Sequence, residues 1–165
     1  MIISIDLDYF YPNNNSVWDY VLKDSFNEQS IETDLNIVNQ IKYLVKNKKL
    51  ILLNKHNELL KFIKSNDIVV NFDFHHDIFY SKKDEKLIDY FEYMDEDFKE
   101  SCWAGYAIKY LNIDYYWIGH HNSDNDINYK KELTFELNSD IIYIIKSENY
   151  INNKQFNYIW RLLNE

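Results

Sequence analysis

Residues 68–77 read IVVNFDFHHD, so an apolar run leads directly into two aspartates and two histidines. The apolar run has the length and composition of a buried strand. Side chains two positions apart in a strand share a face, which would bring Asp73, His75 and Asp77 together at the strand's carboxyl end. Carboxylates and an imidazole that converge favour a divalent cation between them. This stretch therefore predicts a metal site, and a solvated strand end without a ligand is the alternative.

The rest of the chain predicts a sheet around this strand. Further apolar runs predict strands at residues 2–8, 50–53, 114–118 and 141–145. Helically spaced apolar residues predict helices between these strands and after the last one. Apolar strands that alternate with amphipathic helices are typical of a mostly parallel sheet covered on both faces. We therefore predict an α/β protein, with a single three-layer α/β/α domain over residues 1–165.

Polar residues follow nearly every predicted strand. In sheets of this kind the functional site lies outside the carboxyl ends of the strands. The polar residues at these positions are Asp6, Asp8, His56, Asp73, His75, Asp77, His120, His121 and Glu148. The four aspartates would balance two divalent ions, and an oxygen-rich set with some imidazole suits Mn²⁺ better than structural Zn²⁺. Two adjacent ions lower the pKa of a shared water, which predicts metal-assisted hydrolysis.

Several short segments resemble motifs of the arginase/deacetylase (ureohydrolase) superfamily. DFHHD at residues 73–77 resembles its DxHxD motif, and SIDLD at residues 4–8 resembles its SxDxD motif. KHNE at residues 55–58 looks like the site of its remaining metal-binding histidine. With YYWIG at residues 115–119, the pattern is similar to the peptide arginases, small enzymes that convert arginine side chains of ribosomal peptides to ornithine and release urea. The two aspartate motifs occur here in the order opposite to that of ordinary arginases.

The resemblance implies an arginase-like fold and a particular chemistry. The implied ligands of two Mn²⁺ ions are Asp6, Asp8, His56, Asp73, His75 and Asp77. Water activated by the ions would attack the guanidinium carbon of an arginine in a precursor peptide. His76 or His121 would carry a proton to the leaving amine, and Glu148 would hold the guanidinium by paired hydrogen bonds.

The residues leave other functions open. Asp6 and Asp8 also fit the aspartate pair that follows the first strand of Mg²⁺-dependent haloacid-dehalogenase-type phosphatases, although that function leaves residues 73–77 unused. A third alternative is a non-enzymatic module whose acidic edge binds a basic partner. Purely structural roles in a loop or at a helix start are the alternative for four residues: His56, His76, His121 and Glu148.

The composition bounds the class of protein. A formal net charge of -9 argues against a nucleic-acid-binding surface and favours a cationic ligand. A single cysteine, Cys102, excludes an intrachain disulfide and a CxxC zinc site. The first residues lack the basic segment of a signal peptide, and no apolar run has the length of a membrane span. We therefore expect a cytoplasmic protein that binds neither nucleic acid nor membranes, with an oligomeric state that the sequence does not specify.

Overall fold

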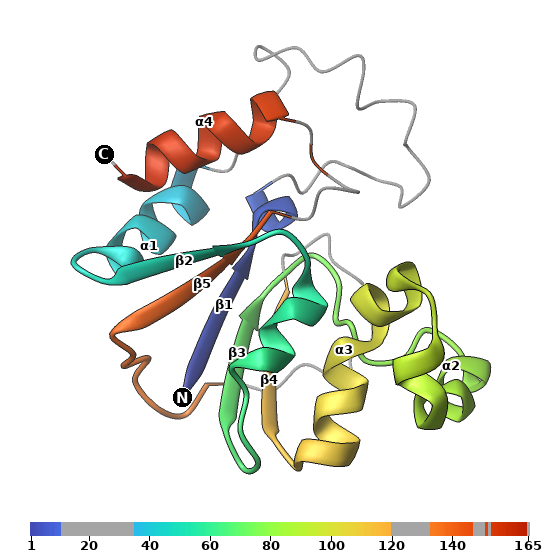
Figure 1. Cartoon of the computed structure of the whole chain (residues 1–165). Helices are drawn as coiled ribbons and strands as arrows, with labels where there is room; N and C mark the ends of the chain where they lie inside the picture. Colours follow the sequence, from blue (N-terminus) through green and yellow to red (C-terminus); the bar gives the residue numbers. More distant parts are fainter. Residues whose placement is uncertain (11–34, 120–132, 147–150, 152, 165) are drawn as a thin grey trace.

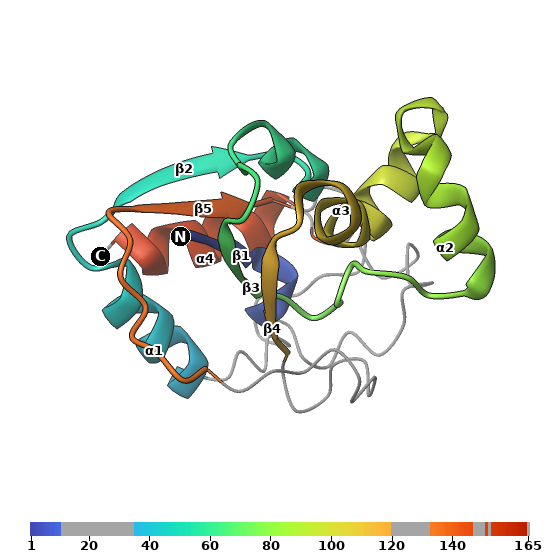
Figure 2. The same cartoon turned by 90° about the horizontal axis from the view of Figure 1, so that it is seen from below.

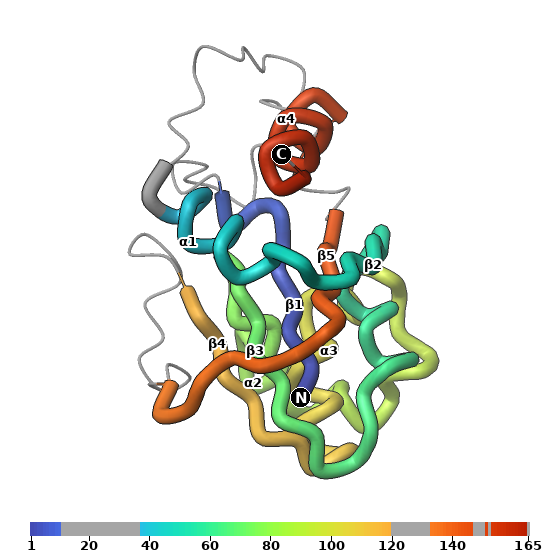
Figure 3. The backbone as a smooth tube through the Cα atoms, turned by 90° about the vertical axis from the view of Figure 1, so that its left-hand side faces the viewer, coloured from blue at the N-terminus to red at the C-terminus, as the bar shows by residue number. Residues whose placement is uncertain are grey.

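The computed structural model describes residues 1–10, 35–119, 133–146, 151 and 153–164. Five strands form one sheet in the order β2-β5-β1-β3-β4, which can be followed in Figures 1 and 3. Their bounds are β1 (Ile2–Asp6), β2 (Lys49–Leu53), β3 (Ile68–Phe72), β4 (Asp114–Ile118) and β5 (Ile141–Ile145). Every pair of neighbouring strands is parallel. The predicted α/β class is confirmed, and the sheet of the described residues is wholly parallel.

Helices cover both faces of this sheet, as Figures 1 and 2 show. On one face α1 (Leu35–Val45) packs against α4 (Asn153–Asn164). On the other face α3 (Glu96–Leu111) packs against two short 3-10 helices, η5 (His56–Lys61) and η6 (Ile88–Tyr93). The remaining elements are η1 (Leu7–Phe10), which follows β1, and α2 (Lys82–Leu87), which contacts η6. None of the described helices is long and apolar enough to cross a membrane.

The two faces of the sheet have separate cores. Ile3 and Ile5 of β1 are fully buried in the core beneath α1 and α4. Val69 of β3 is buried in the other core, together with Trp103 of α3 and Trp117 of β4. Because both faces of each central strand are covered, these strands are apolar along most of their length.

β2 differs from the prediction, because it is an edge strand and not a buried one. It pairs with β5 alone among the described strands, and Leu52 is 41% exposed. A short apolar run does not reveal whether its strand lies at the centre or the edge of a sheet. The order of the strands is therefore information that only the structure supplies.

Gly105 lies where α3 contacts the segment after β3. A Cβ atom at this position would lie 2.5 Å from the backbone oxygen of Ile78 and 2.5 Å from a ring carbon of Phe79. Since backbone atoms cannot move away cheaply, we expect Gly105→Ala to lower the free energy of unfolding by about 1–3 kcal/mol in urea denaturation. Ile108→Ala, at a partly exposed position of α3, is the control and should change it by less than about 1 kcal/mol. Equal stabilities of Gly105→Ala and the wild type would contradict the expectation.

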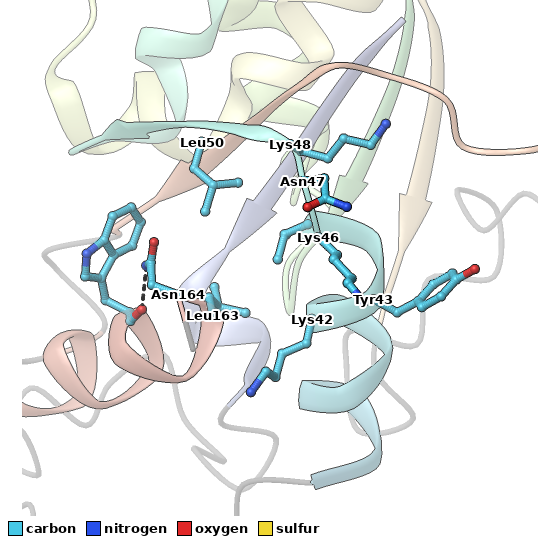
Figure 4. A pocket seen from close by; sticks show the side chains of 10 residues that line it. Lys42, Tyr43, Lys46, Asn47, Lys48, Leu50, Leu163 and Asn164 are labelled. Atoms are coloured by element: carbon cyan, nitrogen blue, oxygen red, sulfur yellow. Dashed lines mark hydrogen bonds between the residues drawn. The ribbon is translucent and has the colours of Figure 1, made fainter.

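An open groove of about 710 Å³ lies between α1, α4 and the start of β2 (Figure 4). Its lining residues are Lys42, Tyr43, Val45, Lys46, Asn47, Lys48, Leu50, Trp160, Leu163 and Asn164. No aspartate, glutamate or histidine is among these lining residues. The groove adjoins the amino end of β2, so it is separate from the carboxyl edge at which the predicted site residues occur.

Candidate metal centre

The six predicted metal ligands lie together at the carboxyl edge of the sheet. They are Asp6, Asp8, His56, Asp73, His75 and Asp77. β1 and β3 are neighbours, and Ile5 is in register with Phe72, so Asp6 and Asp73 follow side by side. η5 begins with His56, which brings this ring to the same edge from the α3 side of the sheet. All of the six except His75 are buried.

Four of these residues form what we term the inner group: Asp6, His56, Asp73 and Asp77. The Nδ1 atom of His56 lies 3.1 Å from Oδ2 of Asp6 and 3.1 Å from Oδ2 of Asp77. The same nitrogen lies 3.3 Å from Oδ2 of Asp73. Three carboxylate oxygens therefore surround one imidazole nitrogen, and all four side chains are buried.

Asp8, Asp73 and His75 form what we term the outer group. Nδ1 of His75 lies 3.1 Å from Oδ2 of Asp8, and candidate ligand atoms of all three residues lie within 4.8 Å of one another. The Oδ1 atom of Asp8 is buried and has no hydrogen-bond partner among the described residues. The side chain of His75 is 13% exposed, so the outer group is the more accessible one. Asp73 belongs to both groups and joins them.

The segment that supplies Asp73, His75 and Asp77 is a turn, contrary to the predicted extension of the strand. β3 ends at Phe72, and the amide of His75 donates to Oδ1 of Asp73 at 3.0 Å. A carboxylate that accepts from the amide two residues later is typical of an aspartate-initiated turn. The three side chains thus converge because the chain bends, and not because they alternate along a strand.

β1 likewise ends earlier than predicted. Its last residue is Asp6, and Asp8 lies in η1, where its amide donates to Oδ1 of Asp6 at 3.0 Å. All four residues of η1 are buried. Local hydrogen bonds of aspartate compete with the strand ladder, and hydrophobic periodicity does not reveal this competition.

Helix α3 holds Asp77 in place through both its backbone and its side chain. Asp77 has φ 53°, in the left-handed region, and its carbonyl oxygen accepts from the amides of Ala104 at 3.0 Å and Gly105 at 3.3 Å. Nε1 of Trp103 donates to Oδ2 of Asp77 at 2.7 Å. The Trp103 ring also stacks on His56, with centroids 5.0 Å apart. The regular helical spacing of Trp103 gives no sign of these polar contacts in the sequence.

The inner group carries an excess of negative charge. Burial lowers the pKa of His56, but hydrogen bonds and charges from Asp6 and Asp77 outweigh burial and raise that pKa to about 10. Burial, followed by the charges of the neighbouring aspartates, raises the pKa of Asp73 well above its ordinary value. Both shifts mean that the cluster binds positive charge readily, either as protons or as a metal cation.

His76, a predicted proton carrier, lies in different surroundings. Its Nδ1 accepts a hydrogen bond from the amide of Ile78 at 3.0 Å. Its ring stacks on Tyr80 at a centroid distance of 4.3 Å and meets Trp117 edge to face. These contacts fix the ring within the protein. Three further predicted residues lie outside the described part of the chain: His120, His121 and Glu148.

The donor atoms of both groups fit divalent cations. Carboxylate oxygens with one imidazole nitrogen in each group form an oxygen-rich set of the kind that Mn²⁺ accepts. The buried Oδ1 of Asp8 is an acceptor for which the described residues offer no donor, and a cation would satisfy it. No protein-family model, curated protein or solved structure matches the chain. The proposals below therefore depend on the geometry of the cluster and on its motifs.

Proposed function

We propose that the chain is a metal-dependent hydrolase that releases urea from arginine side chains of a peptide, leaving ornithine. The observation that carries this proposal is that the inner and outer groups share Asp73. Ions held by two groups with a common ligand would be neighbours. Two such ions, when bound, supply a hydroxide nucleophile near neutral pH.

The charges of the residues support two Mn²⁺ ions. Asp6, Asp73, Asp77 and His56 would hold one ion, and Asp8, Asp73 and His75 would hold the other. Four ionised aspartates balance the charge of two divalent cations. One cation would leave a buried excess of negative charge, which is unfavourable.

Several features support a guanidinium group as the substrate. The motifs at residues 4–8 and 73–77 resemble those of the peptide arginases, and the net charge of -9 attracts cations. Because His75 is the most exposed ligand, the substrate would approach from the outer group. In this proposal His76 or His121 carries the proton to the leaving amine, and Glu148 binds the guanidinium. Because Nδ1 of His76 accepts a backbone hydrogen bond, His76 would act through Nε2.

The direct test is hydrolysis of a peptide by the protein loaded with Mn²⁺. We expect an arginine-containing peptide to release urea and to lose the mass of urea less that of water. The same peptide with lysine in place of arginine is the control, and free arginine measured in parallel separates peptidyl from free substrate. A protein that binds its ions but releases no urea from any arginine substrate would exclude this function.

His75 separates the proposed hydrolase from a phosphatase centred on Asp6. In the hydrolase, His75→Ala removes a ligand of the outer group, so we expect bound Mn²⁺ to fall from about two ions per chain to about one and urea release to be lost. In the phosphatase His75 has no essential part, and hydrolysis of an aryl phosphate would survive the change. Elemental analysis of the purified variant measures the ion content, and Asn54→Ala, at an exposed position after β2, is the control.

A further inference from the structure

Asn71 is a fully buried amide in the otherwise apolar strand β3. Its Oδ1 lies 2.6 Å from Oγ of Ser4 and 3.1 Å from Nε2 of His56. Its Nδ2 lies 2.9 Å from Oδ2 of Asp73 and 3.1 Å from the hydroxyl of Tyr115. One side chain therefore contacts two members of the inner group, His56 and Asp73, without belonging to that group.

Asp73 determines the orientation of the Asn71 side-chain amide, that is, the positions of its oxygen and its NH₂ group. Asp73 is ionised when it holds a cation, and an ionised carboxylate only accepts hydrogen bonds, so the amide atom beside its Oδ2 is the NH₂ group. The amide oxygen then faces Nε2 of His56. A carbonyl oxygen also only accepts, and Nε2 must therefore carry a hydrogen. The hydroxyl of Ser4 donates to the same oxygen and reinforces this orientation.

The protonation of Nε2 decides what Nδ1 of His56 can do. When a cation displaces the second ring proton, only one nitrogen of the imidazole keeps a hydrogen; with that hydrogen on Nε2, Nδ1 presents its lone pair. That lone pair lies within 3.3 Å of carboxylate oxygens of Asp6, Asp73 and Asp77. Four electron-pair donors thus face one another, an arrangement that a cation stabilises.

We propose that Asn71 is a positioning residue that holds His56 in the tautomer with hydrogen on Nε2 and thereby makes Nδ1 the metal-binding atom. The same amide orients Asp73, so it fixes two ligands of the inner group relative to each other. Partners of this kind tune metal sites, because a ligand histidine normally donates its second ring N–H to a fixed acceptor. This inference rests on the proposed metal centre but not on the identity of the substrate.

The first test reads the tautomer directly in the wild-type protein. Histidine is labelled with ¹⁵N, and ¹¹³Cd²⁺ replaces Mn²⁺ so that the metal can be observed by NMR. We expect scalar coupling from the metal to Nδ1 of His56, while Nε2 keeps its hydrogen and shows none. Metal coupling to Nε2 would overturn the inference and leave the metal centre intact.

The same experiment distinguishes this inference from the proposed function. A wild-type protein that binds no divalent ion would overturn both of them. Coupling to Nδ1 in a protein that releases no urea would support the role of Asn71 and reject the arginase activity alone.

The second test compares two substitutions in the same network. Asn71→Leu keeps the branching of the side chain but removes the acceptor for His56 and the donor for Asp73. We expect it to weaken ion binding by about 10- to 100-fold, the usual effect of losing such a partner, as measured by competition with a chelating indicator.

Tyr115→Phe is the matched control for this substitution. It removes a hydrogen-bond partner of Asn71 from the neighbouring strand without touching His56, and we expect ion affinity to change by less than about three-fold. Equal losses in Asn71→Leu and Tyr115→Phe would show that Asn71 only packs the strand, and would overturn the inference. If Asn71→Leu fails to fold, the coupling in the wild-type protein decides the question alone.

Discussion

Asp73→Asn should remove both of the proposed metal ions at once. Asp73 is the ligand common to the inner and outer groups, and its Oδ2 contacts His56 while its Oδ1 accepts from the amide of His75. We expect the ion content to fall from about two per chain to none. Urea release should fall by more than the roughly 100-fold that losing an outer-shell partner costs. Elemental analysis and the peptide assay measure these two effects.

The same substitution should raise the stability of the ion-free protein. Asp73 is 1% exposed, and its burial, followed by the charges of the neighbouring aspartates, raises its pKa. Replacing it by a neutral amide relieves this repulsion, so the ion-free variant should unfold at a higher temperature than the ion-free wild type. Thermal unfolding with and without Mn²⁺ tests whether the variant is more stable than the wild type without ions and less stable with them.

Asp114→Asn is the matched control for both effects. Asp114 is exposed at the opposite, amino end of the neighbouring strand β4, so its loss should change neither the ion content nor the unfolding temperature appreciably. An Asp73→Asn variant that still binds two ions would show that the two groups do not share this ligand.

Raising the pH should destabilise the protein when its ions are absent. The pKa of His56 is about 10 in the folded chain, against an ordinary value of 6.5. The stabilisation from its positive charge is therefore complete below pH 6.5 and is lost as the pH rises towards 10. The pKa of Asp73 is also raised, so ionisation of this carboxyl acts in the same direction. We expect a loss on the order of a few kcal/mol, measured as unfolding free energy of the chelator-treated protein.

Bound ions should reverse the pH dependence of the protein's stability. A divalent cation replaces the protons of the inner group, so ion binding releases protons and tightens as the pH rises. The increase in unfolding temperature that Mn²⁺ produces should therefore grow from about pH 6 to about pH 9. His56→Asn lacks the titrating ring, and its ion-free form should depend less on pH. An ion-free wild type whose stability is constant above pH 6.5 would contradict this account.

The strands were the part of the fold that the sequence predicted best. The predicted bounds of β4 (Asp114–Ile118) and β5 (Ile141–Ile145) agree with the structure, because each is a compact apolar or aromatic run between polar segments. Their neighbours in the sheet were not predictable. β1 lies between β5 and β3, and only pairing across long stretches of chain creates that order.

The candidate ligands of the site were easier to predict than the residues that hold them in place. Aspartates and histidines after apolar runs are visible in one sequence, and the carboxyl ends of parallel strands share an edge. Ser4 and Asn71 are polar residues inside apolar strands, which is the one signal that could have identified them. Their hydrogen bond depends on register, since Ser4 lies opposite Asn71 in the pairing of β1 with β3. The contacts of Trp103 depend in the same way on how α3 packs.

The pairing of β2 with β5 determines when the sheet can be completed during synthesis of the chain. Among the described strands β2 has no partner but β5, so it cannot join the sheet before residues 141–145 have been synthesised. The six candidate ligands all precede residue 78, and five of them lie at the end of β1 or just after β1 or β3, two strands that pair directly. All six candidate ligands and the helix α3 are therefore synthesised before β5, and so before the sheet can be completed. The residues of the proposed metal site are thus complete in the growing chain before the sheet that positions them.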